Sequence, residues 1–289
     1  MIDVLLTQTI NGLMLGMIYV LVAVGLSITF GMLGIINFAH GAFFALGAYI
    51  GLLFFRTFGW WAIWLAPLVV GGIGMALEKV LISKLYGREP LISLVVTFAL
   101  GLLIEAILRW VFGPAGQPFA TPKFLAGVIE YGPILITKYR FAVLLCSVVI
   151  VVGLWLFLTY TSYGHVLQAG SKDPEMVEML GIDFPLVQTL VFGLGCTLAA
   201  AAGVLAAPIW AVIPSMGASA IMPAFVIVAI GGLGSFSGAV VSGLLVGVVT
   251  TLTVQFKPEA ATAAMYVLMF LVLLFFPRGI LGKSWERVE

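Results

Sequence analysis

Long apolar runs, each about the length needed to cross a bilayer, follow one another along most of the 289-residue chain. A transmembrane helix needs about 20 consecutive apolar residues, because each residue adds about 1.5 Å and the hydrocarbon core is about 30 Å thick. The chain is therefore predicted to be an all-α, polytopic transmembrane helix bundle. The predicted spans are 5–30, 35–55, 61–82, 91–112, 139–160, 186–212, 239–256 and 260–276.

One region, 213–238, interrupts this pattern. The sequence IPSMGASAIMP at 213–223 breaks the apolar run, and the apolar stretch at 224–233 that follows is too short to cross a membrane by itself. The glycine-rich sequence GGLGSFSG at 231–238 then breaks the helix again. The pattern predicts a broken or re-entrant helix near 213–238, and eight or nine spans within one transmembrane domain, 1–289.

Composition supports a membrane protein and gives little sign of catalysis. Hydrophobic residues make up 63% of the chain and charged residues 9%, which is too apolar for a soluble domain. The net charge of +1 does not indicate a nucleic-acid partner. The chain contains no GxxxxGK[ST], HExxH or GxSxG sequence, so we expect no catalytic or metal-binding residues and no bound cofactor. ATP, if used, is expected to be hydrolysed by another chain.

The polar segment 161–185, between the fifth and sixth spans, contains a short helix signal. Asp173 can cap a helix, and Pro174 suits its first position because a missing N–H costs nothing there. Glu175 in the first turn is favoured by the helix dipole, and Gly181 can end the helix in the left-handed conformation. The signal predicts a helix of about two turns.

The predicted short helix has one apolar face. Met176, Met179 and Leu180 fall together on it. A helix this short is not stable alone in water, so it must pack on something. Two hypotheses remain open from the pattern: the helix lies on its own membrane domain, or it docks a second protein.

Two groups of residues are candidates for lining a transport pathway. Asn37 and His40 lie three apart, on one face of the predicted span 35–55, and polar groups within spans usually face the bundle interior. An interhelical hydrogen bond and a direct cargo contact both remain open for them. The break at 231–238 gives further candidates, because irregular backbone at membrane depth faces protein or a water-filled cavity. These candidates are Gly231, Gly232, Gly234 and Ser235.

Other residues have structural interpretations. Glycines spaced four apart predict close helix–helix packing, and Glu105 with Arg109 has the favourable order for an ion pair along a helix. The glycine pairs are Gly12 with Gly16, Gly47 with Gly51, and Gly243 with Gly247.

Positive charge orients the bundle only slightly. Placing 79–88 and the C-terminal tail in the cytoplasm follows the positive-inside trend. The segment 161–185 is then also cytoplasmic, and the N-terminus lies outside. The opposite face still carries Arg56, Lys123, Lys138 and Arg140.

Four stretches resemble, in order, the permease subunits of bacterial ABC importers for branched-chain amino acids, and are more similar to the shorter of the two permeases of such Liv-type importers. The resemblance covers essentially the whole chain. The stretches are GLSITFGMLGIINFAHGAFFALGAYIG (25–51), TSYGHVLQAGSKDPEMVEMLGID (161–183), FVIVAIGGLGSFSGAVVSG (225–243) and FPRGILG (276–282).

The resemblance implies a multi-pass protein of the bacterial inner membrane that works by alternating access. Its implied partners are a second homologous permease, two cytoplasmic ATPases that bind ATP and magnesium, and a periplasmic substrate-binding protein. It also implies that the loop at 161–183 couples the permease to the ATPases. The chain departs from the family pattern at two places. In this loop relatives commonly carry basic residues, whereas this chain has His165 and Gln168. After the His-Gly pair of the second span relatives often carry an acidic residue, whereas this chain has Ala42.

Several functions remain open at this stage. A pathway poor in charge suits small zwitterionic or neutral solutes, so the main hypothesis is an importer permease for branched-chain or related small amino acids. A urea or short-amide permease is an alternative in the same class. A self-sufficient secondary transporter and a non-transporting membrane scaffold are alternatives from other classes.

Overall fold

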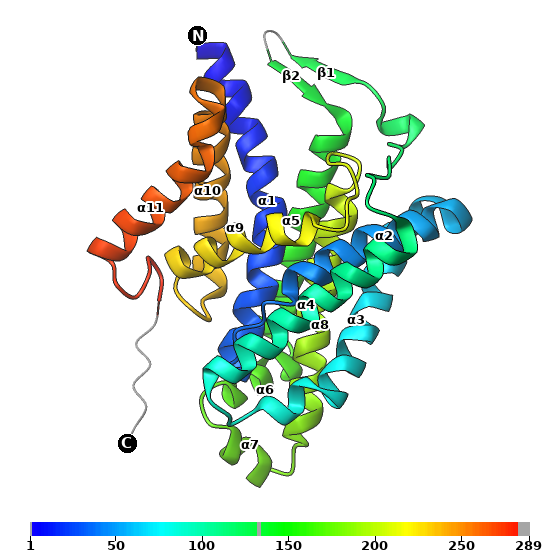
Figure 1. Ribbon diagram of the computed structural model, residues 1–289. Coiled ribbons are helices and arrows are strands. Elements are labelled where there is room, and N and C mark those ends of the chain that lie inside the picture. Colours follow the sequence, from blue (N-terminus) through cyan, green and yellow to red (C-terminus); the bar gives the residue numbers. More distant parts are fainter. Residues whose placement is uncertain (1, 132–133, 283–289) are drawn as a thin grey trace.

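The computed structural model describes residues 2–131 and 134–282, and these form a bundle of helices with one small β-hairpin (Figure 1). The first half contains α1 (Ile2–Leu33), α2 (His40–Phe58), α3 (Ala62–Val80), α4 (Pro90–Phe112), β1 (Val128–Tyr131) and β2 (Ile134–Thr137). The second half contains α5 (Lys138–Tyr160), α6 (Ser162–Gly170), α7 (Pro174–Met179), α8 (Phe184–Ala206), α9 (Met216–Gly231), α10 (Phe236–Phe256) and α11 (Ala261–Phe275). Single-turn 3-10 helices lie at 59–61, 82–85, 123–125 and 258–260.

The prediction of a polytopic helix bundle is confirmed. Within the described residues, seven helical stretches are long and apolar enough to cross a membrane. One of these, His40–Val80, contains both α2 and α3, which turn back on each other at 59–61. The predicted interruption is also confirmed, because α9 has only 16 residues and non-helical segments flank it at 207–215 and 232–235.

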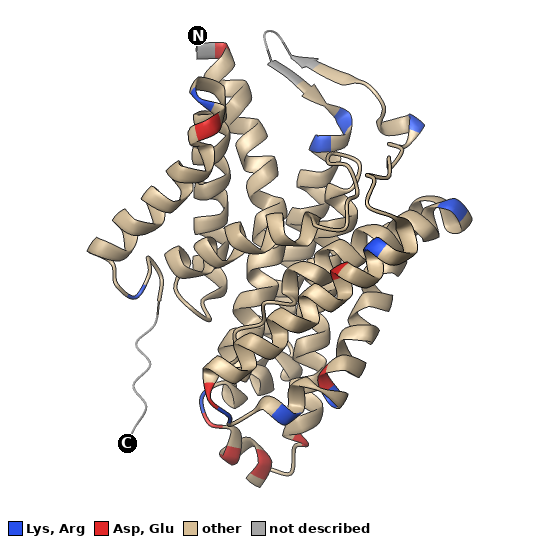
Figure 2. Cartoon of the chain, in the orientation of Figure 1, with Lys and Arg blue, Asp and Glu red and all other residues tan. Residues whose placement is uncertain are grey.

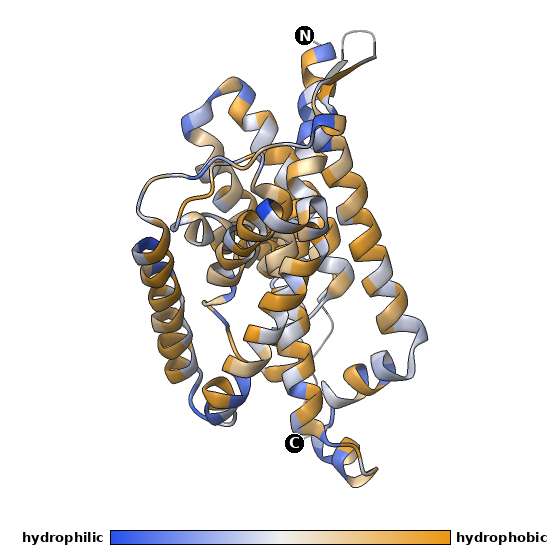
Figure 3. Cartoon of the chain, turned by 90° about the vertical axis from the view of Figure 1, so that its right-hand side faces the viewer, coloured by the Kyte–Doolittle hydropathy of each residue, from blue (hydrophilic) through white to orange (hydrophobic). Residues whose placement is uncertain are grey.

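Helices α1 and α8 form the centre of the bundle. Of their apolar stretches, 72% and 83% lie buried inside the protein, against 33% or less for the other five. Helices α2 and α3 pack on α8, and α10 packs along α1. The outer helices are largely hydrophobic (Figure 3), and many of their large apolar side chains are exposed, as expected where lipid or another membrane protein surrounds them.

Glycines hold α1 and α10 at close range. A Cβ on Gly247 would collide with the backbone of Gly12 and Gly16, and a Cβ on Gly16 would come within 2.8 Å of the carbonyl oxygen of Gly243. Gly47 packs in the same way against Ala200 of α8. The sequence prediction that these glycines allow close helix packing is confirmed.

Two predicted spans were wrong at their ends. The second was placed at 35–55, but residues 34–39 are not helical and α2 begins at His40. Gly34 causes the break, since its φ of +64° ends α1 in a conformation that other residues rarely adopt. The sixth span was predicted to reach residue 212, but α8 ends at Ala206.

The long loop between α4 and α5 contains a β-hairpin. Strands β1 and β2 are antiparallel, with Val128 opposite Thr137. The four-residue strands are too short to give a clear alternating pattern, which explains why the sequence did not reveal them.

The two ends of the bundle differ. The first residues of α1 and the hairpin lie at one end, and α7 lies at the other (Figure 1). Charged residues gather mainly at these two ends, and the region between them is largely uncharged (Figure 2). This distribution is typical of a protein that crosses a bilayer between two aqueous faces.

Candidate functional site

The polar segment between α5 and α8 is held firmly to the end of the bundle. The Thr161 hydroxyl accepts a hydrogen bond of 3.0 Å from the backbone N–H of Gly164 and so caps α6. The Gln168 side chain donates a hydrogen bond of 2.6 Å to the carbonyl oxygen of Leu158. Gln168 thus ties α6 to the last turn of α5.

Helix α7 begins and ends where the sequence predicted. Asp173 accepts a hydrogen bond of 3.0 Å from the N–H of Met176, and Pro174 occupies the first helical position. Gly181 has a φ of +82° and donates to the carbonyl oxygen of Glu178 at 2.9 Å, while Ile182 donates to that of Val177 at 3.4 Å. These two bonds form a Schellman motif, which satisfies carbonyls that the end of a helix leaves free.

The apolar residues of α7 divide into one anchor and three exposed side chains. Val177 is buried, and through it α7 packs on α6 and α8. Met176, Met179 and Leu180 are 51%, 75% and 72% exposed, and Leu180 lies just beyond the last helical residue. We call these three residues the α7 apolar face. A rigidly capped short helix with its largest apolar side chains in the open is typical of a surface that another protein covers.

A buried carboxylate joins three parts of the bundle. Glu78, near the end of α3, is 1% exposed. Its two oxygens accept hydrogen bonds from the Tyr86 hydroxyl at 2.7 Å and the Thr189 hydroxyl at 2.6 Å. Burial, together with the bond to Glu78, raises the pKa of Tyr86. We call Glu78, Tyr86 and Thr189 the Glu78 cluster. The sequence did not predict this cluster, although a glutamate within the apolar run at the end of a span was an available signal.

Asn37 lies in the non-helical segment between α1 and α2, so the prediction that it shares a helical face with His40 was wrong. The Thr97 hydroxyl on α4 holds this segment in place by donating to the carbonyl oxygen of Ile36 and accepting from the N–H of Phe38, both at 3.2 Å. The carbonyl of Asn37 accepts from the N–H of His40 at 3.3 Å and leads into α2.

Asn37 and His40 are buried with polar atoms left free. Nε2 of His40 lies 3.0 Å from the carbonyl oxygen of Val22, but its Nδ1 and both side-chain polar atoms of Asn37 have no hydrogen-bond partner among the described residues. Native proteins rarely leave such groups unpaired, so this position is suited to water or a polar solute.

The break at 231–235 is packed mainly against the chain itself. Gly231 and Gly232 are buried, and the N–H groups of Ile280 and Leu281 donate to the last carbonyls of α9 at 2.8 and 3.1 Å. The closing FPRGILG sequence therefore caps α9, which the sequence analysis did not foresee. Gly234 is exposed, and the Ser235 hydroxyl caps α10 by accepting from Gly238 at 3.1 Å.

The two groups of pathway candidates, Asn37 with His40 and residues 231–235, have different hydrogen-bond partners. Ser27 of α1 donates to the carbonyl oxygen of Ser235 at 3.4 Å, so residues 231–235 border α1. Among the described residues, no hydrogen bond links Asn37 or His40 to this break. That either group lines a pathway stays a prediction.

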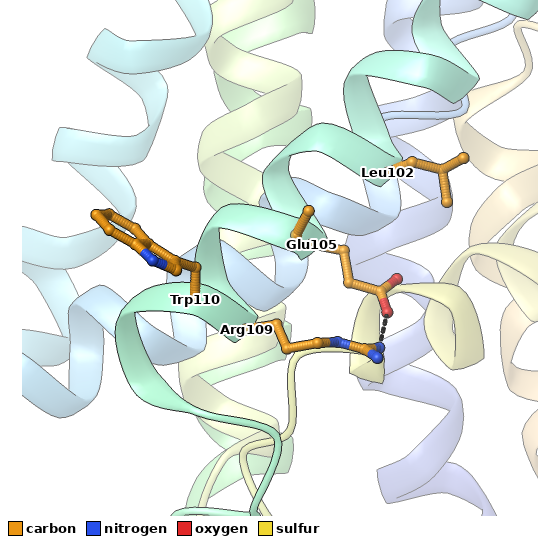
Figure 4. A pocket seen from close by; sticks show the side chains of 5 residues that line it. Leu102, Glu105, Arg109 and Trp110 are labelled. Atoms are coloured by element: carbon orange, nitrogen blue, oxygen red, sulfur yellow. Dashed lines mark hydrogen bonds and ion pairs between the residues drawn. The ribbon is translucent and has the colours of Figure 1, made fainter.

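Helix α4 contains the predicted ion pair. A nitrogen of the Arg109 guanidinium lies 2.8 Å from the Glu105 carboxylate. The pair borders an open pocket with Leu102, Ala106 and Trp110 on the outside of α4 (Figure 4).

Together the spans and the charge distribution define a multi-pass membrane protein that carries a short, capped and exposed helix, α7, at one end. The chain belongs to the family described as "Branched-chain amino acid transport system / permease component", whose model matches residues 8–277. It is 30% identical to BraD of Pseudomonas aeruginosa and 29% identical to LivH of Salmonella typhimurium, both high-affinity branched-chain amino acid transport system permease proteins, with 96% of each chain covered. It is also 24% identical to LivM, a second such permease of Salmonella typhimurium, over 94% of this chain and 70% of LivM.

Proposed function

We propose that this chain is a membrane-spanning permease subunit of an ABC importer for branched-chain or closely related amino acids. The names of its relatives, LivH and BraD, support the substrate class. Segment 161–185 is the coupling loop in this proposal, and the chain itself binds neither ATP nor magnesium. Both belong to two cytoplasmic ATPase subunits, and a periplasmic protein delivers the substrate. The second permease is a homologue, as the similarity to LivM supports.

The observation that carries the proposal is the α7 apolar face. Its three residues are exposed although α7 is anchored by Val177 and capped at both ends. Around them stand exposed Asp173, Glu175 and Glu178, so the matching partner surface is an apolar groove with a basic rim. This contact is made by Asp173, Pro174, Glu175, Met176, Met179, Leu180 and Gly181.

The mechanism is alternating access with α7 as a lever. When ATP draws the ATPases together, they move α7. The motion reaches α8 by direct packing and then α3 through the Glu78 cluster, because its hydrogen bonds join α8 to α3. In this orientation α7 and the C-terminus face the cytoplasm and the N-terminus faces the periplasm of a bacterial inner membrane. Asn37, His40 and residues 231–235 border the pathway.

Reconstitution tests the proposal. Liposomes containing this chain, the second permease and the ATPases should take up L-leucine only when ATP is inside and the binding protein outside. A complex that takes up urea or acetamide but not leucine would favour the amide permease. Leucine uptake by this chain alone, driven by an ion gradient, would favour a secondary transporter and contradict the importer.

A further inference from the structure

Helix α4 has one face against the bundle and one face that this chain leaves uncovered. Its inner face, with Thr97, Leu100 and Ile104, is buried, and Gly101 packs close to Ala39 at the start of α2. The outer face exposes large apolar side chains. These are Leu91, Val95, Phe98, Leu102, Leu103, Ile107, Trp110 and Val111.

Two charges interrupt that apolar face, and they are the only ones in α4. The side chains of Glu105 and Arg109 are 24% and 58% exposed, so this chain does not shield them. Glu105 lies about two turns before the end of the helix. A charged pair at that depth is costly against hydrocarbon, and such groups mark interior or water-filled surfaces.

The hollow around the pair is open to the outside, and α4 alone supplies its charged and apolar side chains. Glu105 and Arg109 reach toward each other, Leu102 lies one turn earlier on the same helix, and Trp110 extends to the other side (Figure 4). The two charges satisfy each other, with a nitrogen of Arg109 2.8 Å from an oxygen of Glu105. Neither charge has a further ion-pair partner within the described residues, and both side chains remain partly exposed.

We propose that this pocket is a transient binding site for a zwitterionic amino acid with an apolar side chain; the inference rests on the proposed function. Arg109 binds the substrate carboxylate through its two-pronged guanidinium, and Glu105 binds the ammonium group. The exchange of one internal ion pair for two pairs with the substrate keeps the charge balanced. Leu102, on the same side of the helix as the pair, contacts the aliphatic side chain, and the second permease closes the space from outside.

The geometry also explains selectivity against uncharged solutes. Urea and short amides cannot separate Glu105 from Arg109, because they offer no full charge to replace either partner. The site therefore favours amino acids over neutral amides, independently of the binding protein.

The test uses the full complex in liposomes, supplied with leucine-loaded binding protein, and compares five forms of this chain besides wild type. Glu105→Gln and Arg109→Gln each remove one charged contact. Arg109→Lys keeps the charge without the two-pronged geometry. The exchange Glu105→Arg with Arg109→Glu keeps an ion pair along the helix but reverses its direction. Arg56→Gln, at the exposed end of α2, is the matched loss of one positive charge elsewhere.

We expect leucine uptake to fall about ten- to hundredfold in both Gln variants, which corresponds to the loss of one charge-assisted hydrogen bond. Arg109→Lys should give an intermediate rate, and the exchange should be as slow as the Gln variants. Arg56→Gln should transport at the wild-type rate, and the ATPases should copurify with every form.

Wild-type uptake in the Gln variants, or full activity of the exchange variant, would overturn the binding site, because a purely structural pair tolerates reversal. If a Gln variant does not assemble, Arg109→Lys decides the matter: an assembled but slower complex supports the site, and an unimpaired one overturns it. Failure of the wild-type complex to import leucine would instead overturn the proposed function.

Discussion

The Glu78 carboxylate on α3 accepts a 2.6 Å hydrogen bond from the Thr189 hydroxyl on α8, although 111 residues separate them in the chain. Its other oxygen accepts from Tyr86, in the connection between α3 and α4. Thr189 also lies 3.0 Å from the carbonyl oxygen of Pro185, in the first turn of α8 and close to α7. One buried side chain thus links the end of α3, the connection between α3 and α4, and the first turns of α8.

Replacing Glu78 by leucine should lower the free energy of unfolding by about 1–3 kcal/mol, because two hydroxyl groups lose their buried acceptor. Glu78→Gln should cost much less. Its amide can donate to Thr189, whose hydroxyl then donates to Pro185, and its oxygen can still accept from Tyr86. Thermal unfolding of the purified protein in detergent would measure both; equal losses for Gln and Leu would contradict this account of the cluster.

Gly247→Leu should separate α10 from α1, because the new side chain has no room beside Gly12 and Gly16. We expect a destabilisation of about 1–3 kcal/mol or more, seen as loss of monodisperse protein in size-exclusion chromatography. Gly72→Leu on α3 is the matched control, since no heavy atom lies within 4 Å of a Cβ built there. If both variants behave alike, the close contact of α1 and α10 is not what limits folding.

Asn37→Leu should separate stability from transport. The amide is buried and has no hydrogen-bond partner in the described part of the chain, so an apolar side chain of similar shape should leave the melting temperature unchanged or raise it. Leucine uptake by the reconstituted complex should nevertheless fall about tenfold, the loss of about 1.4 kcal/mol of polar contact with the passing solute.

Ser147→Ala is the control for this variant, because the Ser147 hydroxyl on α5 is also buried and has no partner among residues 2–131 and 134–282. It should change neither property. Unchanged uptake in Asn37→Leu would show that Asn37 does not border the pathway.

Asp173→Ala should loosen α7 without affecting the spans. Loss of an N-cap costs about 1 kcal/mol, so hydrogen exchange at the amides of α7 should become about fivefold faster. Asp173→Asn should retain most of the protection, because asparagine is an equally good cap. Equal exchange in the wild type and the Ala variant would mean that packing of Val177 alone holds the helix.

The sequence predicted the elements whose signals are local. Spans follow from apolar runs of sufficient length, and α7 follows from Asp173, Pro174 and Gly181, whose roles depend only on the neighbouring backbone. The ion pair of Glu105 and Arg109 was predictable for the same reason, since a helix places residues four apart side by side.

Features that depend on distant partners could not be predicted. The capping of α9 by the backbone of Ile280 and Leu281 joins segments some fifty residues apart and leaves no periodic signal. The partners of Glu78 likewise come from separate elements. The position of Asn37 outside α2 depended on Thr97, which holds a segment that otherwise reads as continuous apolar sequence.

The most direct test of the central claim is the charge change Met179→Asp with Leu180→Asp in the complete complex. It places two carboxylates on the α7 apolar face and leaves buried Val177 in place. Val128→Asp with Ile129→Asp, two exposed apolar residues of β1 at the opposite end, is the matched control. The account predicts that the ATPases no longer copurify with the α7 variant, or that the binding protein no longer stimulates ATP hydrolysis, while the control behaves as wild type. Unchanged assembly and stimulation in the α7 variant would contradict the claim that this helix couples the permease to its ATPases.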